Sequence, residues 1–61
     1  MMKEVWCVRH RDGWCACRPN RRPKETENNV PTKCDYFVNF PMGIEKRVPT
    51  CPDCLKALRG N

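Results

Sequence analysis

The sequence predicts a small α+β domain made of two β-hairpins and a short C-terminal helix. Three observations lead to this prediction: two strand–turn–strand patterns, a Cys-x-x-Cys segment that opens a helical pattern, and a core too small to be stable alone. The chain has 61 residues, so we expect one domain, 1–61, with few apolar side chains to bury. Domains of this size need a metal ion, disulfides or a partner for stability.

Six cysteines offer that stabilisation. An even number in a short chain fits a secreted disulfide scaffold as well as a metal site. The first five residues contain no apolar run typical of a signal peptide, so we expect a cytoplasmic, reducing location. In that environment clustered cysteines bind metal more often than they pair. No segment is apolar for long enough to span a membrane. The alternative is a secreted, disulfide-rich miniprotein without metal.

The first hairpin is predicted near the N-terminus. The dipeptide Asp12-Gly13 between two strand-like runs is a strong signal for a two-residue turn. In the resulting register His10 faces Cys15, and alternation turns Cys7 toward the opposite side of the sheet. The register therefore makes His10 and Cys15 neighbours.

A loop and a second hairpin follow. The segment 19–32 contains three prolines and many polar residues, which predicts a mobile loop. The segment 34–40 is rich in aromatic and β-branched residues and is predicted to be a strand. A turn at 41–43 then returns the chain as a second strand over 44–48.

The C-terminal segment predicts the helix. Thr50 suits the N-cap position, Asp53 three residues later resembles a capping box, and Gly60 suits the position after the last turn. Four side chains fall on one face of this helix and point toward the rest of the chain: Cys51, Cys54, Leu55 and Leu58.

The spacing of the cysteines predicts a metal site. A hairpin with a cysteine at its entrance and a Cys-x-x-Cys after its exit brings three thiolates together, as in treble-clef and zinc-ribbon domains. Here these three are Cys34, Cys51 and Cys54. The fourth ligand of a structural Zn²⁺ would come from the first hairpin, where either Cys15 or His10 would serve.

A second ligand set has comparable spacing. Cys7 and His10 form Cys-x-x-His, which could combine with Cys51 and Cys54. The predicted hairpin places Cys7 on the face opposite His10, and this set leaves Cys34 without a role. We therefore favour the first set.

Three sequence patterns support that choice. They are Arg-His-Arg-Asp-Gly-Trp-Cys-Ala at 9–16, Val-Pro-Thr-x-Cys at 30–34 and Arg-x-Pro-Thr-Cys-Pro-x-Cys-Leu at 47–55. Together they resemble small uncharacterised zinc-binding proteins of phages and bacteria, over most of the chain outside 19–27. The resemblance implies a treble-clef or ribbon-like zinc fold and a phage or prophage origin, which would place the protein in a host cytoplasm. It also implies the ligand set Cys15, Cys34, Cys51 and Cys54, with His10 as the competing fourth ligand and no role for Cys7 and Cys17.

The charge pattern indicates a partner. The net charge is +5, and residues 9–24 contain six bases and one acid. Such a density can follow a phosphate backbone, and an aromatic ring among arginines can stack on a base. We therefore expect nucleic-acid binding through a basic surface: Arg9, Arg11, Trp14, Arg18, Arg21, Arg22 and Lys24. The alternative is a protein-interaction or inhibitor module that binds a host protein.

An enzyme is not expected. A catalytic zinc keeps an open coordination position, and zinc deaminases carry His-x-Glu together with Pro-Cys-x-x-Cys. This sequence has Thr rather than Pro before Cys51 and contains no His-x-Glu. The chain is also too short to enclose a small-molecule substrate, so we expect none.

Overall fold

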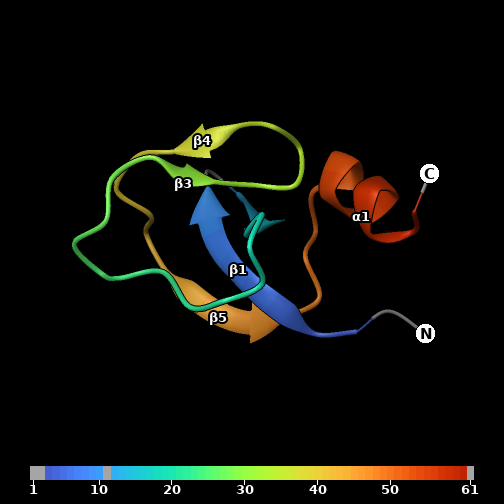
Figure 1. Cartoon of the computed structure of the whole chain (residues 1–61), viewed down its shortest axis with the longest axis horizontal. Helices are drawn as coiled ribbons and strands as arrows, with labels where there is room; N and C mark the ends of the chain where they lie inside the picture. The colour runs from blue at the N-terminus through green and yellow to red at the C-terminus, as the bar shows by residue number, and fades with distance from the viewer. Residues whose placement is uncertain (1–2, 11, 61) are drawn as a thin grey trace.

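Two small sheets and one helix make up the described part of the protein (Figure 1). The computed structural model describes residues 3–10 and 12–60. The elements are, in chain order, β1 (Val5–His10), β2 (Gly13–Ala16), β3 (Val30–Pro31), β4 (Phe37–Val38), β5 (Ile44–Arg47) and α1 (Pro52–Leu58). The antiparallel sheets have the orders β2-β1-β5 and β3-β4. This arrangement confirms the predicted class, a small α+β domain of hairpins with a short C-terminal helix.

The first hairpin forms where it was predicted, but in another register. Val8 pairs with Cys15, and His10 pairs with Gly13. The predicted pairing of His10 with Cys15 is therefore wrong. The physical reason is that Gly13 belongs to the strand: a Cβ atom at this position would lie 2.9 Å from the hydroxyl oxygen of Thr50, so the segment before the helix packs directly on it.

Strand β5 pairs with β1 and not with the strand that precedes it. Ile44 lies opposite Val8, and both contribute to one apolar cluster. The predicted hairpin of 34–40 with 44–48 is thus wrong. The period-two pattern of 44–48 identifies a strand with one apolar face, but it does not identify the strand with which it pairs. In the structure β5 pairs with the edge of β1, where Ile44 lies beside the buried Val8.

The second hairpin instead joins β3 to β4, and β3 begins inside the predicted loop. The predicted loop reached Thr32. In the structure the part of this segment without helix or strand ends at residue 29, directly before β3. Val30 and Thr32 have exposed fractions of 2% and 0%. An isolated bridge between Cys17 and Thr32 connects the end of the first hairpin to the second.

The helix α1 begins one residue later than its predicted cap implies. Cys51 is the N-cap residue and makes no side-chain capping bond. The hydroxyl of Thr50, predicted as the cap, instead accepts a hydrogen bond from the backbone N–H of Trp14. Gly60 has the predicted role at the other end: its φ is +79° and its N–H donates to the carbonyl of Ala57.

Among the described residues, buried apolar side chains form two clusters. The first lies between the three-stranded sheet and α1 and contains Val5, Cys7, Cys15, Ala16 and Cys54, with Trp14, Cys34, Cys51 and Leu58 packed against it. The second lies between this sheet and the β3–β4 pair and contains Val8, Cys17, Val30 and Val38, with Trp6 and Ile44 packed against it. Both clusters are small, so burial alone provides little stability.

Candidate metal centre

Four cysteine sulfurs converge at one point. The Sγ atoms of Cys15, Cys34, Cys51 and Cys54 all lie within 4.8 Å of one another. In a tetrahedral site with metal–sulfur bonds of about 2.3 Å, neighbouring sulfurs are about 3.8 Å apart. The sulfurs would therefore need to approach one another by no more than about 1 Å to hold such an ion. These are the four cysteines that the sequence analysis favoured.

Strand β2 holds together the three segments that carry these sulfurs. The backbone carbonyl of Trp14 accepts hydrogen bonds from the N–H groups of Thr50 and Cys51 at 3.0 and 3.1 Å. Two residues later, the carbonyl of Ala16 accepts a bond of 2.9 Å from the N–H of Lys33. The cysteine between these two anchor residues is therefore held between the helix start and the β3–β4 turn.

Cys34 lies in the turn between β3 and β4, which points toward α1 in Figure 1. The N–H of Asp35 donates to the carbonyl of Thr32 at 3.1 Å and closes the turn. Asp35 has a φ of +65°, a left-handed conformation that Asp tolerates better than most residues. Cys34 was predicted at the entrance of a strand, and the structure corrects this to a tight turn that presents the side chain to β2.

The other two sulfurs come from the first turn of α1. Cys54 is fully buried, while Cys51 is half-buried. Their spacing of three residues places both on the same side of the helix. The free N–H groups of a helix start favour thiolates, so this pair is suited to binding a cation.

The surroundings shift the pKa values of three of these thiols, and not all in the same direction. Burial, together with the neighbouring sulfurs of the cluster, raises the pKa of Cys15 and of Cys54. Burial also acts to raise the pKa of Cys34, but hydrogen bonds with the Thr32 hydroxyl and the Tyr36 backbone outweigh it, so this pKa lies below its usual value. Two thiols buried against other sulfurs resist ionisation unless a cation compensates the charge.

The remaining candidate ligands lie elsewhere. The ring of His10 packs against the ring of Tyr36, with centroids 4.6 Å apart. The buried thiol of Cys7 donates to the backbone carbonyls of Val5 and Arg47, both at 3.3 Å. The structure therefore brings neither member of the alternative Cys-x-x-His pair into the sulfur cluster.

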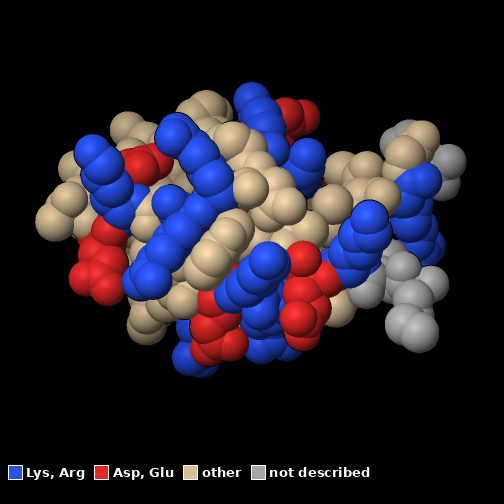
Figure 2. All heavy atoms as spheres, turned by 60° about the horizontal axis from the view of Figure 1, so that its bottom comes forward, with Lys and Arg blue, Asp and Glu red and all other residues tan. Residues whose placement is uncertain are grey.

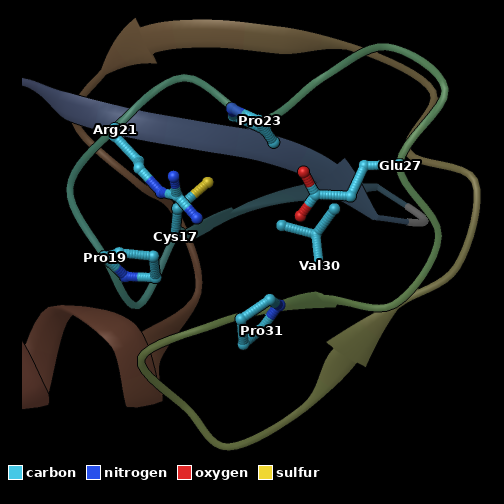
Figure 3. A pocket seen from close by; sticks show the side chains of 7 residues that line it. All are labelled: Cys17, Pro19, Arg21, Pro23, Glu27, Val30 and Pro31. Carbon is cyan, nitrogen blue, oxygen red and sulfur yellow. The ribbon is translucent and has the colours of Figure 1, made fainter.

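Cys17 faces a small cavity beneath the loop 19–29. Arg21 and Glu27 extend their charged ends into it, as Figure 3 shows, and three prolines and Val30 complete its lining. Its volume of about 40 Å³ has room for water but not for a drug-sized ligand. Burial, with the nearby Cys7 and Glu27, raises the pKa of Cys17 to about 11. Cys17 is thus a protonated thiol at neutral pH.

The predicted basic surface is partly compensated by acids. Arg18 lies 2.7 Å from Asp35, with its guanidinium 5.8 Å from the ring centre of Phe37. The charge of Arg18 is therefore already paired. Arg22 pairs with Glu25 at 3.5 Å.

The other predicted basic residues are distributed over the surface. Arg9, Arg21 and Lys24 are exposed, and Arg11 lies outside the described residues. Trp14 is half-buried, and the guanidinium near it belongs to Arg47, 5.0 Å from the ring centre. Figure 2 shows Lys and Arg side chains spread along one face with Asp and Glu between them.

Sequence reasoning missed two residues of this region. Arg47 was placed on a strand without a role, although it covers Trp14. Thr32 was assigned to the loop, although its hydroxyl oxygen lies 3.2 Å from the sulfur of Cys34. The signal that could have indicated Thr32 is its position two residues before a predicted ligand.

Comparison with known protein families, curated proteins and solved structures found no match to this chain. The resemblance noted in the sequence therefore identifies no family, and the finding that supports it is the four-cysteine cluster, which is consistent with a zinc-binding site. Among the described residues, α1 is the one helix, and it is too short to cross a membrane.

Proposed function

We propose that the protein is a structural zinc module that acts by binding a partner rather than by catalysis. The observation that carries this proposal is the convergence of four sulfurs from three segments of the chain. A tetrahedral site with four thiolates is closed, because no position remains for water or substrate, and closed sites are structural. Soft thiolate ligands and tetrahedral geometry suit Zn²⁺ or iron, and Zn²⁺ has no redox chemistry of its own.

The clustering also favours a metal over disulfides. Disulfides join sulfurs in pairs at about 2 Å, and nothing in that chemistry requires two pairs to meet at one point. A metal ion requires such a meeting. It also supplies what the two small apolar clusters lack, because the free energy of binding to a site that exists only in the folded chain is free energy of folding.

Native mass spectrometry of the protein purified without chelator tests this function. We expect one zinc per chain, together with six titratable thiols after denaturation. Removal of the metal by a strong chelator should then unfold the domain, visible as loss of the near-ultraviolet circular dichroism of Trp6 and Trp14. A metal-free mass with no free thiols would overturn the proposal and point to the secreted disulfide form. Iron in place of zinc would correct the metal only.

We further propose that the partner is a nucleic acid. The net charge of +5 and the exposed bases Arg9 and Lys24 support this proposal. Fluorescence anisotropy with labelled single strands and duplexes at increasing salt provides the test. Arg9→Glu should weaken binding more than Arg22→Glu, because Arg9 is exposed on β1 whereas Arg22 is already paired with Glu25. Equal effects of the two variants, or no binding at low salt, would refute it.

A protein partner is the second candidate. Phe40 and Met42 are 74% and 77% exposed, and Tyr36 and Phe37 are about half exposed. Aromatic residues and Met are enriched at the centres of protein interfaces. Binding of this kind would persist at moderate salt and be lost in Phe40→Ala, whereas nucleic-acid binding would show the opposite salt response.

A further inference from the structure

Thr32 is held in place by its backbone, independently of its hydroxyl. Its side chain is the fully buried polar one among the described residues. Its N–H donates to the carbonyl of Tyr36 at 3.1 Å, and its own carbonyl accepts bonds from the N–H of Asp35 at 3.1 Å and from the Arg18 side chain at 3.3 Å. The hydroxyl can therefore change its hydrogen-bond partner while these backbone bonds keep the β3–β4 turn in place.

That hydroxyl has one proton and two neighbours able to receive it. Its oxygen lies 3.2 Å from the sulfur of Cys34 and also donates to the carbonyl of Tyr36. While Cys34 is a thiol, its S–H donates to the hydroxyl, and the hydroxyl donates to the carbonyl, so every proton is used. The Cys34 S–H and the Thr32 O–H then each have one acceptor.

Metal binding changes the direction of these hydrogen bonds. The thiol proton of Cys34 leaves to water, and the sulfur becomes an acceptor only. The hydroxyl can then turn from Tyr36 to the sulfur, because the Tyr36 carbonyl keeps the N–H of Thr32 as a donor. A hydrogen bond to a charged sulfur is stronger than one to a neutral carbonyl, so this rotation of the hydroxyl is favourable.

We propose that Thr32 is a positioning residue of the metal centre, whose hydroxyl donates its hydrogen bond to the Cys34 sulfur when the ion is bound. The inference rests on the proposed metal function. The bond fixes the direction of the Cys34 side chain and withdraws charge from its sulfur. Outer-shell bonds of this kind typically change metal affinity by about 10- to 100-fold.

The chain contains its own matched control. The tripeptide Val-Pro-Thr occurs at 30–32 and again at 48–50, each time shortly before a cysteine of the cluster. The hydroxyl of Thr50 accepts a bond from the backbone N–H of Trp14 at 2.8 Å and forms no hydrogen bond with a sulfur of the described residues. The loss of Thr50 therefore reports on the scaffold, while the loss of Thr32 reports on the sulfur.

Cobalt(II) is a suitable probe, because its sulfur-to-metal charge-transfer absorption responds to the electron density on each thiolate. In the full chain, we expect Thr32→Val to lower Co²⁺ affinity by about 10- to 100-fold and to shift this absorption. Thr32→Ser should restore both, since it keeps the hydroxyl. Thr50→Val should lower the midpoint of urea unfolding and leave the absorption in place.

Each result decides the inference. An unchanged affinity and absorption in Thr32→Val would overturn it while leaving the metal function intact. If Thr32→Val does not load, Thr32→Ser decides: recovery supports the hydroxyl, and a defect as large as that of Val shows that packing of the methyl group matters instead. A wild-type chain that binds no Co²⁺ would overturn the metal function and the inference together.

Discussion

The hydroxyl oxygen of Thr50 accepts a hydrogen bond of 2.8 Å from the backbone N–H of Trp14. Each of these residues directly precedes a cysteine of the cluster, Cys51 and Cys15 respectively. The bond therefore ties strand β2 to the segment that precedes α1, the two parts of the chain that carry these cysteines.

Gly13 makes this contact possible, and we expect Gly13→Ala to destabilise the domain. A Cβ atom at Gly13 would lie 2.9 Å from the Thr50 hydroxyl oxygen, so one of them must shift, at a cost of about 1–3 kcal/mol. Urea unfolding of the metal-loaded protein measures this cost. In a Thr50→Ala background the clash is absent, and Gly13→Ala should cost less. Strictly additive costs would contradict the proposed packing.

The cysteine set is tested by single substitutions. Cys15→Ser should abolish stoichiometric zinc binding, since it removes one of four thiolates. His10→Ala should retain one zinc per chain, because the ring packs on Tyr36 outside the sulfur cluster. Native mass spectrometry provides the readout, with Cys17→Ala as the control cysteine. Zinc lost in His10→Ala but kept in Cys15→Ser would reverse the assignment.

The sequence allowed much of this site to be predicted, for reasons of local geometry. Cys51 and Cys54 are three residues apart at a helix start, so their common direction follows from the helix itself. The turn that presents Cys34 depends on the left-handed backbone conformation of Asp35, which no pattern in the sequence predicted. The choice between His10 and Cys15 stayed open, because the predicted hairpin register placed the two side by side; that register is wrong, and the sulfur cluster contains Cys15.

Strand pairing could not be predicted because it is decided by tertiary contacts. A strand with one apolar face fits any sheet edge with a complementary face, and 44–48 joined β1 rather than its neighbour in sequence. Likewise, Asp-Gly usually occupies a hairpin turn, but Gly13 is held in β2 by the packing of Thr50 against it. In both cases a partner distant in the chain overrode a local preference.

Alkaline pH should destabilise the domain through Cys17. Its pKa is raised from 9.0 to about 11 by burial and by the nearby Cys7 and Glu27. Between these values the unfolded chain loses the proton while the folded chain keeps it, so the folded state binds more protons and stability falls as pH rises. The contribution is fully present below pH 9 and lost by about pH 11, amounting to roughly 3 kcal/mol.

Urea unfolding of the metal-loaded protein at several pH values between 8 and 11 checks this expectation. Cys17→Ala should be less stable than wild type at pH 8, because it leaves a cavity, but its stability should fall less steeply above pH 9. Cys7 is present in both proteins, so the difference between the two pH profiles reports the removal of Cys17. An equally steep decline in the variant would show that Cys17 is not the group responsible.

Phe40 offers a test of the exposed apolar surface. Its φ is +52°, a conformation that costs a bulky residue about 1–2 kcal/mol, while its side chain is 74% exposed and gains little from burial. We therefore expect Phe40→Gly to keep or raise the stability of the domain, by up to about 1 kcal/mol, in thermal or urea unfolding.

Phe37→Gly is the matched control, because Phe37 lies in β4 without a positive φ and is 49% exposed. Glycine in a strand should cost about 1 kcal/mol there. Opposite signs for the two substitutions would show that the chain holds the Phe40 ring outward at the expense of its own stability, as expected of a residue kept for a partner. A similar loss in both would show that the Phe40 ring supports the fold, and would remove the observation that favours a protein partner.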